Sequence, residues 1–263
     1  MPRNKKIALV LGGGSAFGYA HIGVIKAMEE KGIRPDLIVG TSMGSIVGSY
    51  YAVFGEIDSL VEKISKTSAV KIAADPGFLS LGVIKAKKIE ELFKEVFGDR
   101  NFAHCKIPLI VNACDINSGE NVIYKKGRIK DAVRASMSVP GIFAPVVKGS
   151  KVLVDGGVVN NLGINLAPKS HKVIAVKVTP DSNKKIFSPK DMGTLNPIKR
   201  MRYYSDLINK SFTILINKLE DQMVRDHEDI IYLKPDLKDF NYASFGKYRE
   251  LIKAGYDEAS KKL

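Results

Sequence analysis

The chain has 263 residues, of which 45% are hydrophobic and 26% are charged, and its formal net charge is +13 at pH 7. This length and composition fit one sizeable α/β domain, or one domain with a smaller appendage, and exclude a largely disordered chain. No apolar run reaches the length of a membrane span, and the run near the start is too short for a secretory signal. We therefore expect a soluble, cytoplasmic protein.

Apolar runs and helical periodicity alternate along the sequence. In chain order, the pattern predicts a strand over Ile7 to Leu11, a helix over Gly18 to Lys31, a strand from Leu37, a helix after Ser42, helices over Ile57 to Ser65 and Ile84 to Phe97, a strand over Leu109 to Cys114, its hairpin partner over Asn121 to Tyr124, a helix over Ile129 to Met137, strands over Val152 to Val154 and Val173 to Val178, a helix over Ile198 to Arg225, a strand over Ile230 to Leu233 and a helix over Gly246 to Lys262. This alternation predicts an α/β fold with a mostly parallel central sheet and helices on both faces.

Prolines, a glycine and polar residues between Thr179 and Pro197 are typical of a loop. We therefore expect a core over residues 1–180 and a helical extension over residues 181–263 that packs on the same domain. The long helix of that extension carries apolar residues at helical spacing, namely Ile208, Phe212, Leu215 and Leu219. Packing onto the sheet is the favoured interpretation of this stripe, and a membrane-facing surface is the alternative. Between Lys66 and Gly82, turn signals mixed with apolar residues fit either a lid or a packed loop.

The excess of basic residues leaves two interpretations open. They could attract the protein to an anionic membrane surface, peripherally at the inner membrane, or form a solvated surface without a specific partner, which is the favoured interpretation. No nucleic-acid-binding pattern accompanies them, so we expect no nucleic-acid partner. Cys105, Cys114 and the histidines lack the spacing of metal ligands or of a disulfide framework, so we expect no metal and no cofactor. The oligomeric state stays open.

Ser42 stands in the stretch "GTSMG", between a predicted strand and a predicted helix. A turn sharp enough to push a serine side chain into a cleft leaves no room for Cβ atoms on its neighbours, and Gly40 and Gly44 meet that need. The pattern favours a nucleophile elbow, and a chance match in a glycine-rich chain is the alternative.

Gly12, Gly13 and Gly14 end the first predicted strand and precede a helix, so their backbone N–H groups could hold an anion. A dinucleotide-binding loop would need a third glycine where Phe17 stands, and an acidic residue at the end of the second strand, which is absent. With Ser42 at the tip of the next strand, the oxyanion of an acyl-transfer intermediate is the better candidate.

Asp155 ends a short apolar strand and is followed by Gly156 and Gly157. A carboxylate in that place could enter a tight site beside the serine and act as its base. An aspartate that begins an ordinary turn is the alternative.

Together these segments resemble the patatin-like phospholipase family, and more narrowly its bacterial members. The resemblance includes the glycine loop with the following "AHIGV", the elbow, the Asp-Gly-Gly turn and the stretch "ASMSVPGIFAPV" from Ala135 to Val146. It implies a three-layer patatin-like architecture and a Ser-Asp dyad that acts without histidine on acyl esters of lipids. In this chain Ser42 would be the nucleophile and Asp155 the general base and later acid. The amides of Gly13 and Gly14, helped by Met43, would form the oxyanion hole.

One departure concerns Phe17, because the family usually has Arg or Lys there. Its presence makes a neutral acyl ester more plausible than a phospholipid, unless Phe17 simply packs in the core and another basic residue replaces the charge.

Two other functions stay open. One is an α/β-hydrolase triad of Ser42, Asp155 and His171, and the other is a lipid-binding or regulatory protein that has kept the fold and lost turnover.

Overall fold

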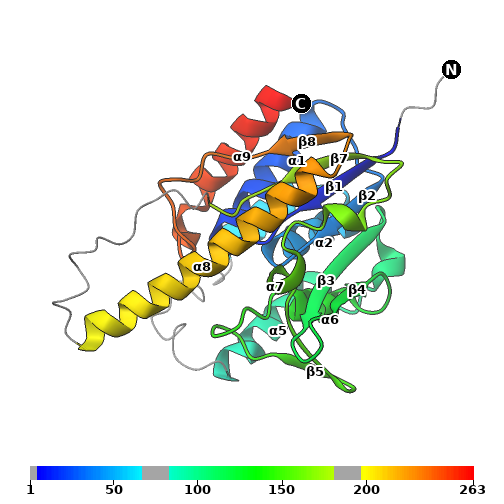
Figure 1. Cartoon of the computed structure of the whole chain (residues 1–263). Helices are drawn as coiled ribbons and strands as arrows, with labels where there is room; N and C mark the ends of the chain where they lie inside the picture. The colour runs from blue at the N-terminus through cyan, green and yellow to red at the C-terminus, as the bar shows by residue number, and fades with distance from the viewer. Residues whose placement is uncertain (1–4, 67–82, 181–196) are drawn as a thin grey trace.

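The computed structural model describes residues 5–66, 83–180 and 197–263, which form a central sheet with helices on both faces (Figure 1). The strands are β1 (Ile7–Leu11), β2 (Leu37–Gly40), β3 (Leu109–Asp115), β4 (Asn121–Tyr124), β5 (Val146–Lys148), β6 (Lys151–Asp155), β7 (Lys172–Val176) and β8 (Ile230–Leu233). The α-helices are α1 (Ala20–Glu30), α2 (Met43–Phe54), α3 (Asp58–Lys66), α5 (Val83–Phe97), α6 (Ile129–Ser136), α7 (Gly157–Asn160), α8 (Pro197–Arg225) and α9 (Tyr248–Lys262). Short 3-10 helices are η1 (Ser15–Tyr19), η3 (Phe102–His104), η4 (Ile164–Leu166) and η6 (Phe245–Lys247).

The sheet has the strand order β5-β6-β3-β2-β1-β7-β8, with β4 paired to β3. Strands β3, β2, β1, β7 and β8 run parallel, whereas β4, β5 and β6 run antiparallel to their neighbours. Leu11 of β1 is in register with Gly40 of β2 and with Val176 of β7, so the carboxyl ends of these three strands form one edge of the sheet. The expected mostly parallel α/β sheet is confirmed.

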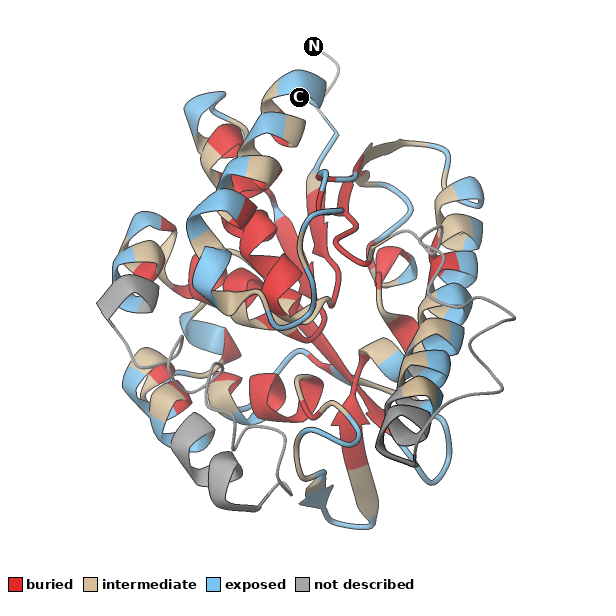
Figure 2. Ribbon diagram, turned by 90° about the vertical axis from the view of Figure 1, so that its left-hand side faces the viewer, coloured by how far each residue is buried: buried red, intermediate tan, exposed pale blue. Residues whose placement is uncertain are grey.

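Alternating residues of each parallel strand point to opposite faces, as the period of a strand requires. On β1, Leu9 and Leu11 belong to the larger core, under α1, α2, α6 and α9. Ala8 and Val10 belong to the smaller core on the other face, which η4 and the carboxyl-terminal end of α8 cover. Figure 2 shows the buried residues concentrated in the sheet and in the helix faces against it. Both faces are therefore covered, and parallel strands require this.

The predicted elements match the observed ones closely, with two additions. β5 and α7 were not predicted, because elements of 3 and 4 residues are too short to show a periodicity. The expected helix from Gly18 is preceded by the η1 turn, so it begins at Ala20. The segment between Lys66 and Gly82, in which a lid or a packed loop was expected, lies outside the described residues.

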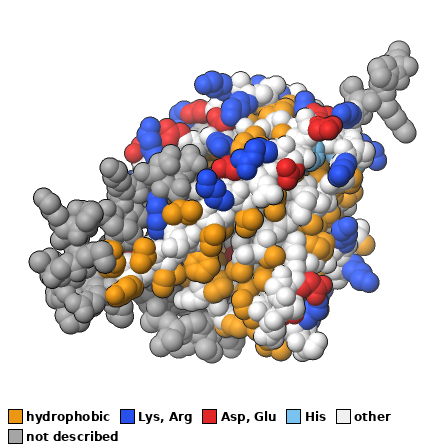
Figure 3. Space-filling view, viewed as in Figure 1, with side chains coloured by type: hydrophobic (Ala, Val, Ile, Leu, Met, Phe, Trp, Pro, Cys, Tyr) orange, Lys and Arg blue, Asp and Glu red, His pale blue; other side chains and the backbone are white. Residues whose placement is uncertain are grey.

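The apolar stripe of α8 does not pack on the sheet, so the favoured interpretation of that helix was wrong. Ile208, Phe212, Leu215 and Leu219 are 55%, 57%, 59% and 48% exposed. Figure 3 shows hydrophobic side chains gathered along this helix on the molecular surface. The inward face of α8 instead carries polar residues, with Asn217 at 7% and Glu220 at 2% exposure, and adds apolar side chains to the smaller core only at its end, through Met223 and Val224. No helix in the described part of the chain is both long enough and apolar enough to span a bilayer.

α9 packs directly on α1 through glycines on both helices. A Cβ on Gly255 would overlap the carbonyl of Ala20, and a Cβ on Gly23 would overlap the carbonyl of Ile252. The two backbones therefore touch, which is only compatible with glycine at these positions. This contact holds the carboxyl-terminal helix against the element that follows the glycine loop.

We expect Gly255→Ala to lower the free energy of unfolding by about 1–3 kcal/mol, because the new methyl group forces the helices apart. Alanine has a higher helix propensity than glycine, so a loss of stability can only come from this helix contact. Gly246→Ala, where an added Cβ meets nothing within 4 Å, is the control and should leave stability nearly unchanged. Urea unfolding of both variants checks the prediction, and equal stabilities would contradict it.

Candidate active site

Ser42 lies in the turn between β2 and α2 with φ 53° and ψ −123°, a left-handed conformation that is costly for a residue with a side chain. A Cβ on Gly40 would lie 2.6 Å from the carbonyl oxygen of Gly44, and a Cβ on Gly44 would overlap the carbonyl of Leu11. The helix N-terminus thus sits directly on the end of β1. The geometry is that of a nucleophile elbow, in which the two flanking glycines are required for space.

Asp155 ends β6, whose antiparallel pairing with β3 brings it opposite Ala113. Its carboxyl group is buried, and Oδ1 accepts a hydrogen bond from the Gly157 N–H at 2.7 Å. Burial raises the pKa of Asp155 to about 6, while the Ser42 hydroxyl and the Gly157 amide favour the ionised form and oppose that rise. The second oxygen, Oδ2, has no well-aligned hydrogen bond in the described part of the chain. The structure therefore brings Ser42 and Asp155 together with one carboxylate oxygen available.

The segment after α6 holds the serine turn and the aspartate turn together. The Ser136 hydroxyl accepts the backbone N–H of Ser42 at 2.9 Å, and the Ser136 carbonyl accepts the N–H of Gly156 at 3.2 Å. The carbonyl of Ser138 accepts the N–H of Asp155 at 2.9 Å. Sequence reasoning singled out this stretch as a whole but gave Ser136 no role, since nothing local indicates which backbone groups its hydroxyl and carbonyl reach.

The glycine loop lies against the serine, because a Cβ on Gly13 would be 3.1 Å from the Ser42 Cβ. Its amides are not equivalent. Gly12 N–H donates to the carbonyl of Val176 and Gly13 N–H to the carbonyl of Asn161, both at 3.2 Å. The amides of Gly14 and Met43 donate to no acceptor among the described residues.

These contacts narrow the expected set of oxyanion donors. The Gly13 amide is occupied by a carbonyl, which leaves Gly14 and Met43 as the free donors of the set. Met43 is the first residue of α2, so its N–H also carries the positive end of the helix dipole. Both free amides belong to segments that adjoin Ser42, namely the glycine loop and the first turn of α2.

Phe17 is 1% exposed and packs in the core, with its ring edge-on to Tyr242 at a centroid distance of 5.0 Å. An aromatic contact thus takes the place of the basic side chain that the resemblance led us to expect. The buried cations in the described part of the chain lie on other elements: Arg134 on α6, and Lys177, which follows β7 and forms an ion pair with Glu220 at 3.5 Å.

His171 does not complete a triad with Ser42 and Asp155. His171 immediately precedes β7, whereas the serine turn follows the carboxyl end of the parallel strand β2, so the two lie at opposite edges of the sheet. A strand of this length spans about 16 Å, which is far beyond hydrogen-bond reach. His21 is near the loop, but its Nε2 is bound to the Gly12 carbonyl at 2.8 Å, and burial lowers its pKa to about 4. It is therefore neutral at pH 7 and holds the loop.

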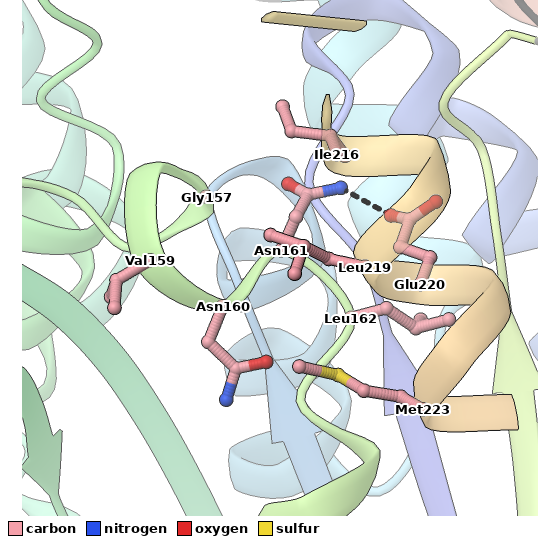
Figure 4. A pocket seen from close by; sticks show the side chains of 9 residues that line it. All are labelled: Gly157, Val159, Asn160, Asn161, Leu162, Ile216, Leu219, Glu220 and Met223. Carbon is pink, nitrogen blue, oxygen red and sulfur yellow. Dashed lines mark hydrogen bonds between the residues drawn. The ribbon is translucent and has the colours of Figure 1, made fainter. Parts of the chain in front are cut away.

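A pocket lies between α7 and α8 and includes Gly157, two residues after Asp155 (Figure 4). Its lining is mostly apolar and consists of Gly157, Val159, Asn160, Asn161, Leu162, Ile216, Leu219, Glu220 and Met223. Within the described residues, no group of three or more His, Cys, Asp or Glu side chains could hold a metal ion.

The sequence and the fold both have known relatives. Residues 9–168 match the family model described as patatin-like phospholipase. An uncharacterized NTE family protein of Mycobacterium tuberculosis is 34% identical over 160 residues, which cover 60% of this chain and 44% of that protein. The lysophospholipase nte1 of Aspergillus fumigatus is 26% identical over 96% of this chain and 18% of its own length.

The human patatin-like phospholipase domain-containing protein 6 is 29% identical, over 95% of this chain and 20% of its own length. Among solved structures, VipD from Legionella pneumophila superposes with a TM-score of 0.56 at 14% identity, over 99% of this chain and 66% of that one, so the likeness concerns the fold. This chain thus spans less than half the length of these curated relatives. Because the family model matches more than half of the chain, the protein belongs to the patatin-like phospholipase family.

Proposed function

We propose that this protein is a lipid acyl hydrolase in which Ser42 is the nucleophile and Asp155 the general base. The observation that carries the proposal is the pairing of a serine in a strained turn with a buried carboxyl group whose pKa is raised to about 6. The name of its fungal relative, lysophospholipase, supports a lysophospholipid as the first substrate to assay. Position 17 holds a buried phenylalanine and so supplies no cation for a phosphate group. This supports a neutral acyl ester as the second substrate to assay.

The reaction proceeds in two halves. The Ser42 oxygen attacks the ester carbonyl carbon while its proton passes to Asp155, and a tetrahedral oxyanion forms. As the intermediate collapses, the bond to the alcohol oxygen breaks and Asp155 returns the proton to that oxygen. Water then attacks the acyl-enzyme, again giving its proton to Asp155, and the fatty acid leaves as Ser42 recovers its proton.

An aspartate is ordinarily a weak base for a hydroxyl, because its pKa is near 3.9. Desolvation in this site raises the pKa of Asp155 to about 6, which brings it closer to the operating pH, where a general base is most effective. The same burial excludes water and strengthens the hydrogen bonds to the oxyanion. Asp155 can thus do in this site what histidine does in a triad.

The free amides of Gly14 and Met43 stabilise the oxyanion in this proposal. Removing one such donor typically costs about 100- to 1,000-fold in rate, so we expect the loss of either amide to lower the rate of ester hydrolysis substantially. The dipole of α2 adds to the same effect.

We also propose that the exposed stripe of α8 contacts the lipid surface that supplies the substrate. Side chains such as Phe212 and Leu215 are more than half exposed, and a contiguous apolar surface of this kind is unusual unless it binds something. The net charge of +13 favours an anionic membrane over a neutral one.

Ser42→Ala should abolish fatty-acid release from a lysophospholipid and from a neutral short-chain ester, because the attacking oxygen is lost. Release is measured from both substrates in the presence of a chelator, with Ser170→Ala, which changes an exposed serine, as the control. If the wild-type protein binds vesicles and releases no fatty acid, the lipid-binding interpretation replaces the enzyme. If Ser42→Ala stays active, the nucleophile is another residue.

Activity should fall as pH drops below about 6, because protonated Asp155 cannot accept the serine proton. Its raised pKa means that the folded protein binds the proton more tightly than the unfolded chain, so ionisation costs stability as pH rises from about 4 to 6. Asp155→Asn should be inactive, because its amide cannot accept the proton, yet it should be more stable than wild type by about 3 kcal/mol at pH 8 and about equal to it at pH 4. Thermal unfolding at both pH values, combined with the pH profile of kcat/KM, checks this.

The double variant Phe212→Ser/Leu215→Ser should bind anionic vesicles at least about tenfold more weakly, because burying each apolar side chain contributes roughly 1.5–3 kcal/mol. Val147→Ser removes a side chain that is 72% exposed on β5 and should leave binding unchanged. Sedimentation with anionic and with neutral vesicles measures the effect. Equal binding by both variants would place the lipid contact elsewhere, and a change in molecular mass with the double variant would assign the stripe to a second copy of the chain.

A further inference from the structure

A buried polar cluster connects α8 to the glycine loop, and we call it the Glu220 cluster. It consists of Asn161 after α7, Lys177 and Thr179 after β7, and Glu220 on α8. The Asn161 side-chain nitrogen Nδ2 donates to Glu220 Oε1 at 2.7 Å, a contact that Figure 4 shows beside the pocket. Nδ2 also lies 2.9 Å from the Thr179 hydroxyl, and Lys177 Nζ lies 3.5 Å from Glu220 Oε2. Side chains from separate elements thus converge behind the loop.

The cluster ends on the backbone of Gly13. Asn161 Nδ2 lies 3.3 Å from the Gly13 carbonyl oxygen, and the Thr179 hydroxyl lies 3.4 Å from it. The Asn161 carbonyl accepts the Gly13 N–H at 3.2 Å, so Asn161 binds this residue through its backbone and its side chain. A Cβ on Gly13 would overlap Asn161 Oδ1, so the contact is close.

The Gly13 carbonyl and the Gly14 N–H belong to one peptide group. That group is planar and trans, so the C=O and the N–H point in opposite directions. Because the cluster binds the Gly13 carbonyl, the Gly14 N–H points away from the cluster. This N–H donates to no acceptor among the described residues. A rotation of this peptide would turn the free donor away from an oxyanion beside Ser42.

Stability alone is a poor reason for this arrangement. A buried ion pair is often no better for stability than apolar residues of similar volume, since desolvation offsets the attraction. Lys177 and Glu220 are 3% and 2% exposed, so both have lost nearly all contact with water. Burial raises the pKa of Glu220, and the Asn161 amide and Lys177 oppose that rise by favouring the carboxylate. What the carboxylate oxygen provides is a fixed acceptor for Asn161.

We propose that Glu220 is a positioning residue, which fixes the Asn161 side chain and through it the Gly13–Gly14 peptide, so that the Gly14 N–H is directed at the oxyanion. The inference rests on the proposed hydrolase function for its effect on rate. It does not depend on that function for its effect on the loop. It also assigns a role to the polar face of α8, the helix whose opposite face is exposed and apolar.

The test compares two double variants in which the ion pair is removed. Lys177→Met/Glu220→Gln keeps an oxygen that can accept from Asn161, whereas Lys177→Met/Glu220→Leu lacks it. Both are neutral at these positions, so neither leaves a buried charge without its partner. Asp221→Asn changes the neighbouring carboxylate, which lies 3.7 Å from Lys177 and is 40% exposed, and is the control on the same helix.

We expect the leucine variant to have a kcat about 10- to 100-fold lower than the glutamine variant at similar KM, because a misplaced donor weakens binding of the transition state and not of the substrate. The glutamine variant and Asp221→Asn should stay within about threefold of wild type in kcat. Equal kcat in the two double variants, or a loss confined to KM, would overturn the proposal. Thermal unfolding of each variant establishes that the comparison is between folded proteins.

The amide NMR signals of Gly13 and Gly14 test the loop without any turnover. In the leucine variant they should shift or broaden, and in the glutamine variant they should remain as in wild type. If the wild-type protein proves inactive and these signals still change in the leucine variant, the proposed function fails. The positioning of the Gly13–Gly14 peptide by Glu220 is then still supported. If the signals are the same in both variants, the positioning role is overturned whatever the activity.

Discussion

The contact of Gly44 with the end of β1 is the constraint on which the site depends. A side chain at Gly44 would overlap the Leu11 carbonyl, and the N–H of Thr41 donates to that same carbonyl at 3.1 Å. The first turn of α2 therefore lies directly against the strand that leads into the glycine loop. This approach places Ser42 beside Gly13 and directs the free amide at the start of α2 to the same region. Any larger residue at Gly44 would separate Ser42 from the glycine loop.

The residues of the site are held in states that the chain would otherwise avoid. Ser42 has a left-handed backbone conformation, and Asp155 is buried, which disfavours its charge. Hydrogen bonds from the segment after α6 maintain both, since Ser136 binds the serine turn and the aspartate turn at once. Strain and burial of this kind reduce stability and are typical of functional sites.

α8 has its apolar side chains outside and part of its polar side chains inside. Burial of Glu220 and Asn217 is tolerated because each has partners, namely Asn161, Thr179 and Lys177 for the former and the Pro180 carbonyl for the latter. One helix is therefore linked to the glycine loop through Asn161 and Thr179 on one side and exposes an apolar surface on the other. A lipid surface bound by the outer face would be separated from the glycine loop only by this helix and the side chains of Asn161 and Thr179.

The sequence by itself determined the α/β fold, the order of its main elements and the pairing of the serine turn with the glycine loop. These depend on local patterns, such as periodicity and glycines beside Ser42, which act within one or two turns of the chain. It could not decide which amides of the loop stay free, because the acceptor for Gly13 comes from Asn161, far along the chain. The sequence also favoured the wrong buried face of α8, since an apolar stripe does not indicate that buried polar partners lie against the opposite face. Those features depend on contacts between segments distant in sequence, and only the tertiary structure brings such segments together.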